Sequence, residues 1–185
     1  HATRSAFGGF CLLNNAAIAA QHLIDSGVSR VTVLDVDAHH GNGTQQIFYQ
    51  RGDVQFVSIH MDPDQNYPWF VGRAHERGDG PGAGANLNLP LPLGTTGDRF
   101  LTDLRTGIDA VSAFDPEYVI VSLGVDPAEG DPTAGLCLST SDFAEVGQAI
   151  ATIDRPLLLV QEGGYQLHRV GADVRAVLDG VCSGQ

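Results

Sequence analysis

The feature that most constrains the fold of this sequence is a repeated alternation of short apolar runs with segments of helical periodicity. Four runs are rich in leucine and β-branched residues and are almost continuously apolar: 31–37, 54–61, 118–124 and 156–164. Such runs are typical of strands in a parallel sheet, because helices cover both faces of such a sheet and bury its strands on both sides.

Apolar residues three and four positions apart predict helices between these strands. The helical segments are 14–27, 100–111, 142–150 and 170–177. The first can be capped by Asn14 or Asn15, and Asp142 with Glu145 three residues later marks the start of the third. Repeated βα alternation predicts an α/β fold, with a mainly parallel sheet and helices on both faces. A length of 185 residues suits a single domain over 1–185.

The segment from Asp62 to Gly97 departs from this alternation. It is rich in Gly, Pro and Asn, and we expect it to lack regular structure. Loops of this length in a compact domain are usually functional, so this one either lies near the site or is a surface excursion. Its GDGPGAGAN run is not followed by Lys-Ser/Thr, which argues against a phosphate-binding loop.

Charge and composition narrow the classes of partner. The formal net charge of −12 would repel a nucleic acid but attract a cationic small molecule. No apolar stretch approaches the roughly 18 residues that a membrane helix needs, so we expect no membrane partner. Cys11, Cys137 and Cys182 are an odd number and widely spaced, which argues against a disulfide framework and favours the cytoplasm.

Each predicted strand ends in polar residues that could take part in chemistry. The first run leads into DVDAHH from Asp35, and the second ends in SIH from Ser58. The third ends in GVD at 124–126, and the fourth in EGGY at 162–165. Ligands bind beyond the carboxyl ends of the strands in open α/β sheets. Four polar strand ends that meet at one edge therefore predict a functional site there.

The spacing within DVDAHH indicates a metal site. Alternation along an extended chain places Asp35, Asp37 and His39 on one face. Burying unpaired carboxylates is costly, and the segment contains no Lys or Arg, although a salt-bridge cluster remains the alternative. Asp37 and His39 with Asp126 from the third run would form a three-ligand site with an open position for water. These ligands suit zinc, and also Fe(II) or Co(II).

The motifs resemble those of a known family. DVDAHHGNGT at 35–44, with GVD at 124–126 and EGGY at 162–165, resembles the histone deacetylase superfamily over essentially the whole chain. The long segment after Ser58 and the GVDPAEGDP segment resemble its acetylpolyamine amidohydrolase branch. Arginase-like ureohydrolases share the fold, but they use two metals and further aspartates that are not found here. The resemblance implies a three-layer α/β/α fold of the arginase/deacetylase type.

The resemblance also implies roles for individual residues. Asp37, His39 and Asp126 would ligate zinc. Tyr165 would donate a hydrogen bond to the oxyanion that forms when water attacks the acetyl carbonyl. His1 would act as general base and then as general acid. These roles fit amide hydrolysis, because a bound metal activates water and an oxyanion donor stabilises the developing charge.

Residues around this centre are implied to bind a second ion and the substrate. Asp35 and Ser58 would help to hold a structural potassium ion. Phe10 and Tyr67 would line a narrow tunnel for an extended acylated amine, with the backbone of Gly9 near the scissile amide. The resemblance also allows a homodimer.

The start of the chain bears on the completeness of the site. His1 matches the second of the family's two tandem histidines, and Asn42 would hydrogen-bond to it. The first tandem histidine and the N-terminal strands are absent from these 185 residues, so we expect an N-terminally truncated piece. The predicted activity is deacetylation of acetylated polyamines or similar small acylated amines. The alternatives are an acetyl-lysine protein deacetylase and a metal-binding but inactive fragment.

Overall fold

A five-stranded parallel sheet organises the computed structural model, which describes residues 1–183. The strand order is β3-β2-β1-β4-β5. The strands are β1 (Val31–Asp35), β2 (Val54–Met61), β3 (Asn86–Leu91), β4 (Tyr118–Leu123) and β5 (Leu157–Gln161). The prediction of a parallel sheet from the βα alternation is confirmed.

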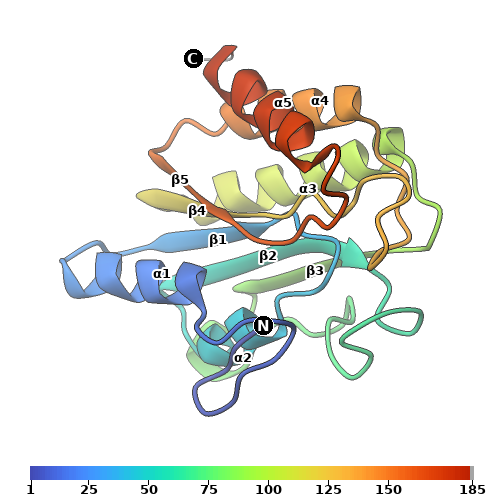
Figure 1. The fold of residues 1–185 in the computed structure, drawn as a ribbon. Coiled ribbons are helices and arrows are strands. Elements are labelled where there is room, and N and C mark those ends of the chain that lie inside the picture. The colour runs from blue at the N-terminus through green and yellow to red at the C-terminus, as the bar shows by residue number, and fades with distance from the viewer. Residues whose placement is uncertain (184–185) are drawn as a thin grey trace.

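Helices cover both faces of this sheet and complete a three-layer α/β/α arrangement (Figure 1). Helices α3 (Gly97–Phe114), α4 (Thr140–Ala151) and α5 (Val170–Ser183) lie on one face, and α1 (Asn15–Asp25) and α2 (Asn42–Phe48) lie on the other. None of the helices described over residues 1–183 is both long and apolar enough to cross a membrane.

Two hydrophobic cores lie on the two faces of the sheet. Alternate residues of β1 divide between them, with Leu34 in the core under α3 and Val33 in the core under α1. Residues of β2 and β4 alternate in the same way. Because both faces are buried, most positions in these strands are apolar, which explains the nearly continuous apolar runs in the sequence.

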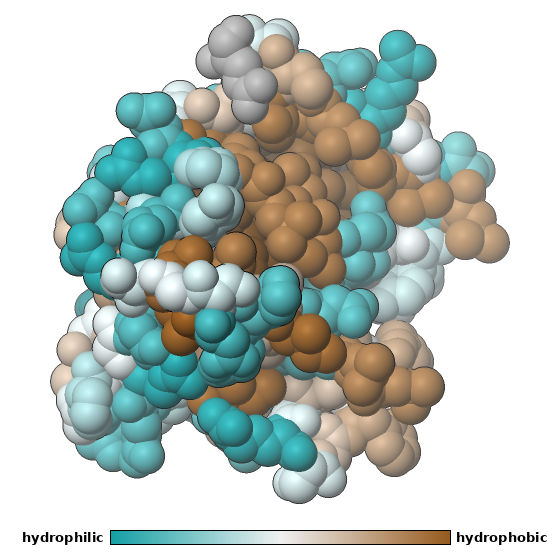
Figure 2. Space-filling view, turned by 90° about the vertical axis from the view of Figure 1, so that its left-hand side faces the viewer, coloured by the Kyte–Doolittle hydropathy of each residue, from teal (hydrophilic) through white to brown (hydrophobic). Residues whose placement is uncertain are grey.

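The edge of the sheet at β5 is less covered than its centre. Residues of β5 are mostly half-buried, and the side chain of Leu158 is 45% exposed. One side of the molecule also carries a broad hydrophobic patch (Figure 2).

The expectation that 62–97 lacks regular structure is wrong. This segment contains a short 3-10 helix (Gly80–Gly82) and strand β3, which pairs with β2. Strand β3 was not predicted from the sequence, because its buried residues Asn86 and Asn88 are polar. Both are buried, and their side-chain amides donate to Gln45 Oε1 at 3.0 and 2.8 Å. A polar network therefore replaces the apolar pattern that usually marks a strand.

Helix α2 and the start of α4 also differ from expectation. Helix α2 was not predicted, because most of its buried residues are polar or glycine. Helix α4 is capped by Ser139, whose side chain accepts from the backbone N–H of Asp142, while the Asp142 side chain accepts from the Ser139 N–H. The capping pair is thus Ser139 and Asp142, and the predicted pair of Asp142 with Glu145 is wrong.

Candidate active site and metal centre

The candidate site lies at the carboxyl ends of the central strands. Asp35, the last residue of β1, lies in register with Ser58 of β2 and Ser122 of β4. Asp35, Ser122 and Glu162 line a cavity of about 190 Å³ that reaches into this edge of the sheet. The parallel topology thus gathers the polar strand ends at one edge, as the sequence predicts.

The chain beyond β1 is shaped by turns and not by extended alternation. The strand ends at Asp35, and Asp35 Oδ1 accepts a hydrogen bond from Asp37 N at 3.1 Å. Asp37 Oδ1 in turn accepts from His39 N at 2.8 Å. Such bonds to the residue two positions on are typical of aspartate in turns. The extended geometry that we expected for 35–39 is therefore wrong, although all three side chains still line the cavity.

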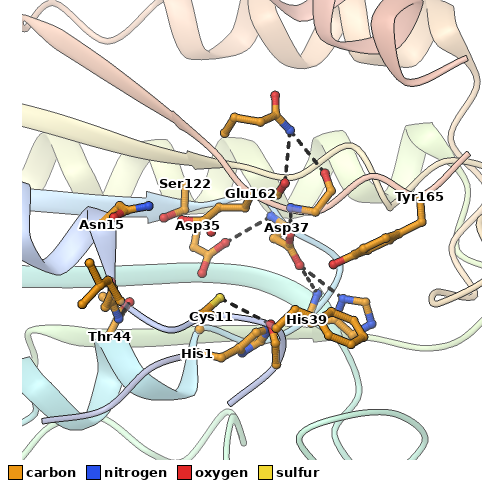
Figure 3. A pocket seen from close by; sticks show the side chains of 17 residues that line it. His1, Cys11, Asn15, Asp35, Asp37, His39, Thr44, Ser122, Glu162 and Tyr165 are labelled. Carbon is orange, nitrogen blue, oxygen red and sulfur yellow. Dashed lines mark hydrogen bonds and ion pairs between the residues drawn. The ribbon is translucent and has the colours of Figure 1, made fainter. Parts of the chain in front are cut away.

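The structure brings Asp37, His39 and Asp126 together. One ligand atom from each lies within 4.8 Å of the others, and all three residues are buried. His39 Nδ1 lies 2.9 Å from Asp126 Oδ2 and 3.3 Å from Asp37 Oδ1. Figure 3 shows Asp37 and His39 at the centre of the site, with Tyr165 extending toward them. Asp126 comes from the loop after β4 and occupies the place predicted for the third ligand.

The charges of this cluster favour a cation between the two carboxylates. Burial and the charge of Asp37 raise the pKa of Asp126 to about 7. Burial opposes the charged form of His39, but the hydrogen bonds and charges of Asp126 and Asp37 outweigh it and raise the pKa of His39 to about 11. The three groups hold a proton where a divalent metal would place its charge, so metal binding must displace that proton.

The surroundings of the two carboxylates fit a metal ion. A Cβ atom at Gly163 would collide with the carboxylates of Asp37 and Asp126, and one at Gly124 would collide with Asp37. Gly163 N also donates to Asp37 Oδ2 at 2.9 Å. Among the described residues no Lys or Arg forms an ion pair with either carboxylate. A buried imidazole between two carboxylates, with no described Lys or Arg paired to them, is a set of ligands suited to a divalent metal.

The outer edge of the His39 ring is fixed by a backbone carbonyl. His39 Nε2 lies 2.9 Å from the carbonyl oxygen of Thr133. Because a carbonyl only accepts hydrogen bonds, Nε2 carries the proton in the neutral ring and Nδ1 keeps its lone pair toward the carboxylates. Such bonds to the ring nitrogen remote from the metal set the tautomer and orientation of histidine ligands.

His1 lies beside the cluster and is held by Asn42. His1 Nδ1 donates to Asn42 Oδ1 at 2.7 Å, so the lone pair of the neutral ring is on Nε2. The ring centroids of His1 and His39 are 6.3 Å apart. Gly9 packs against the His1 ring with a φ of 51°, and a Cβ atom there would collide with the ring. The close approach of this backbone therefore requires glycine.

Tyr165 and the predicted tunnel residues surround a second, outer cavity. This cavity of about 620 Å³ is lined by aromatic and apolar side chains together with His1, His39, Asn66 and Thr133. Phe10, Tyr67, Gly9 and Tyr165 are among its lining residues. Burial and the charges of Asp126 and Asp37 raise the pKa of Tyr165 to about 12, so its phenol stays protonated and can donate. The ring centroids of Phe10 and Tyr165 are 6.0 Å apart.

The two residues expected to hold potassium have other partners in this structure. Asp35 Oδ1 accepts from Asp37 N, and Ser58 Oγ donates to His60 Nδ1 at 2.9 Å. Burial and the charges of Asp37 and Glu162 raise the pKa of Asp35 well above its usual range. Asp35 thus lies in an acidic environment in which a monovalent cation would be stabilising, and its role in binding potassium stays a prediction.

Asp131 and Thr133 were not predicted as site residues from the sequence. Both lie in the GDPT segment after β4, where no strand or helix periodicity singles them out. Asp131 Oδ1 accepts from Thr133 N at 2.9 Å and from Thr133 Oγ1 at 2.8 Å. An aspartate followed two residues later by threonine is a turn signal, and it could have identified this loop as ordered.

The fold and the site define a three-layer α/β protein with a cluster of one histidine and two aspartates beside a tyrosine and a second histidine. A family model described as "Histone deacetylase domain" matches residues 1–181. The chain belongs to the histone deacetylase family, as the resemblance of its motifs implies.

Similar proteins place it more closely within this family. It is 47% identical over 181 residues to the acetylpolyamine amidohydrolase of Mycoplana ramosa. The matched region covers 98% of this chain and 53% of that protein. The crystal structure of an acetylpolyamine aminohydrolase from Burkholderia pseudomallei superposes with a TM-score of 0.96 at 42% identity, over 100% of this chain and 54% of that one. The crystal structure of an HDAC homolog from Aquifex aeolicus superposes with a TM-score of 0.90 at 33% identity, over 97% of this chain and 50% of that one. The chain thus spans about half the length of these relatives.

Proposed function

We propose that this protein is a metal-dependent amide hydrolase that removes acetyl groups from acetylated polyamines or similar small acylated amines. The observation that carries the proposal is the buried cluster of Asp37, His39 and Asp126. Asp37 and His39 line the same cavity as Tyr165 and His1. Relatives named acetylpolyamine amidohydrolase support this substrate class.

Asp37, His39 and Asp126 would hold the metal, for which we propose zinc with Fe(II) or Co(II) as alternatives. When bound, the metal would polarise the acetyl carbonyl and make water a better nucleophile. The chain's own residues would then move protons and stabilise charge. His1 Nε2, which carries the lone pair, would accept the proton of the attacking water. Tyr165 would donate its hydroxyl proton in a hydrogen bond to the carbonyl oxygen as negative charge develops there.

The amide C–N bond breaks when the protonated His1 returns its proton to the departing nitrogen. The products are acetate and a free amine, so the water oxygen ends in acetate and no redox partner is needed. The hydrogen bond from His1 Nδ1 to Asn42 Oδ1 would keep Nε2 directed at the reacting atoms throughout. Asn42 is uncharged, so it orients the ring without stabilising the imidazolium as a carboxylate would.

The outer cavity would select the substrate by shape and by its aromatic faces. Its described lining residues include Phe7, Phe10 and Tyr67 but no carboxylate. A cationic amine would therefore be attracted by the net charge of −12 and contact aromatic rings at the mouth, without a direct ion pair there. We further propose a cytoplasmic location, a structural potassium ion beside Asp35 and Ser58, and a homodimer as the assembly.

Metal content and turnover test this proposal. The protein as its gene encodes it should contain about one equivalent of metal, and the Asp126→Asn variant should contain far less. It should hydrolyse N-acetylputrescine with a higher kcat/KM than an acetyl-lysine peptide. The opposite preference would support the protein deacetylase alternative. Bound metal without turnover of either substrate would support the inactive alternative, and absence of metal would contradict the proposal altogether.

A further inference from the structure

A buried carboxylate outside the metal cluster connects two parts of the site. Asp131 is 5% exposed and lies in the loop between β4 and α4. Its side chain accepts three hydrogen bonds, and none of them comes from a cationic side chain. A buried carboxylate whose hydrogen bonds all come from uncharged donors is costly, which makes Asp131 a candidate for a specific task.

One oxygen of Asp131 fixes the orientation of Thr133. Oδ1 accepts from both the backbone N and the hydroxyl of Thr133, at 2.9 and 2.8 Å. The carbonyl of this same residue lies 2.9 Å from His39 Nε2. Asp131 therefore holds the group that sets the tautomer of His39, without touching His39 itself.

The other oxygen of Asp131 holds the backbone of Tyr165. Oδ2 accepts from Tyr165 N at 2.9 Å. Tyr165 follows two glycines and lies outside any strand or helix. It is 36% exposed. A backbone after two glycines has much conformational freedom, so this bond is a strong restraint on where the phenol points.

We propose that Asp131 is a positioning residue that keeps the metal ligand His39 and the hydrogen-bond donor Tyr165 in register across the site. This inference rests on the proposed function, because it assigns Asp131 to the same centre. Its two oxygens act in different directions, one through the Thr133 carbonyl and the other through the backbone of Tyr165.

The Asp131→Asn variant tests both directions with little change in volume. Asparagine offers one acceptor oxygen and an NH₂ group, so whichever way the amide turns, donor meets donor at Thr133 or at Tyr165. Asp173→Asn is the matched control. Asp173 is 1% exposed and accepts from Thr140 Oγ1 and Arg169, so it is also buried but has no contact with the site residues.

Three measurements separate positioning from a purely structural role: the dissociation constant for Zn²⁺ by competition with a chromophoric chelator, kcat and KM, and the unfolding midpoint in denaturant. Asp131→Asn should weaken Zn²⁺ binding or lower kcat by roughly 10- to 100-fold, with KM little changed. Asp173→Asn should lower the unfolding midpoint but leave Zn²⁺ affinity and kcat near those of the parent. Equal effects of the two variants on all three measurements would overturn the proposal.

A double-mutant cycle tests the connection to Tyr165. If Asp131 acts through Tyr165, the loss in kcat from Asp131→Asn should shrink markedly when Tyr165→Phe is already present. Full additivity, together with unchanged Zn²⁺ affinity, would overturn the proposal. If the parent binds Zn²⁺ but hydrolyses no acylated amine, the proposed function fails while the Zn²⁺ affinities still decide the role of Asp131 toward His39.

A milder variant covers the case in which Asp131→Asn does not fold. Thr133→Val keeps the shape of the side chain and removes only the hydroxyl bond to Asp131 Oδ1. Loss of one such bond should weaken Zn²⁺ binding by roughly two- to tenfold. Zn²⁺ affinity equal to that of the parent in a folded Thr133→Val protein would contradict the path from Asp131 through Thr133 to His39.

Discussion

At the scale of single residues, each histidine of the site is oriented by a hydrogen bond at one ring nitrogen. His1 Nδ1 donates to Asn42 Oδ1, and His39 Nε2 donates to the Thr133 carbonyl. The other nitrogen of His39, Nδ1, faces the carboxylates of Asp126 and Asp37. The orientation of the two imidazoles thus depends on residues that are far away in sequence and have no chemical role of their own.

The Tyr165→Phe variant tests the role of the phenol. Tyr165 is 36% exposed and its hydroxyl has no hydrogen-bond partner among the described residues, so we expect unchanged folding. Because an oxyanion donor acts mainly in the transition state, kcat should fall by about 10²–10³. Steady-state kinetics on N-acetylputrescine measures this. Tyr118→Phe, at an exposed position at the start of β4, is the control and should leave kcat unchanged. A Tyr165→Phe enzyme with full kcat would rule out the assigned role.

At the scale of elements, helix ends and edge strands are where the sequence pattern was least informative. Helix α4 begins with a reciprocal pair of bonds between Ser139 and Asp142, whereas α3 begins at Thr96 without a side-chain cap bond. The two helices therefore offer a matched comparison of what a cap contributes to stability.

Ser139→Ala should lower the free energy of unfolding by about 1 kcal/mol, because the backbone N–H of Asp142 in the first turn of α4 loses its acceptor. Thr96→Ala, which removes a residue at the equivalent position of α3 without a cap bond, should change it by less than half as much. Denaturation in guanidinium chloride measures both. A loss for Thr96→Ala as large as that for Ser139→Ala would show that the capping bonds in α4 contribute little.

At the scale of the whole molecule, the sheet encloses ionisable groups that must stay neutral. His60 in β2 is fully buried. Its Nδ1 accepts from Ser58 Oγ, and its Nε2 lies 2.9 Å from the carbonyl oxygen of Gly72. Its ring centroid is 4.6 Å from that of His40. Burial lowers the pKa of His60 to about 4, although nearby Glu76 and Asp62 favour the charged form.

This shift predicts a pH dependence of stability. In the unfolded chain the pKa of His60 returns to about 6.5, so the unfolded state binds more protons than the folded state between about pH 6.5 and 4. The free energy of unfolding should therefore fall as the pH drops through this window, with His60 contributing roughly 3 kcal/mol. Urea denaturation at several pH values measures the slope. His60→Asn should flatten it, and an unchanged slope in that variant would contradict the assignment.

The layered fold and most of the candidate metal site follow from the sequence pattern. Short, almost continuous apolar runs are typical of strands covered on both faces. Parallel strands bring their polar ends to one edge, so Asp37, His39 and Asp126 were predicted to meet there. This prediction does not require knowledge of contacts between residues far apart in sequence. It depends only on local periodicity and on the common direction of the strands.

The hydrogen bonds that orient the site residues are visible only in the folded structure. Strand β3 was hidden because Asn86 and Asn88 are buried by pairing with Gln45, a contact between residues about forty positions apart. Asp131 and Thr133 were missed for the same reason, since their partners His39 and Tyr165 come from other elements. Hydrogen bonds between polar side chains and distant backbone groups leave no periodic trace in a sequence, so the residues that orient the site appear only when the chain is folded.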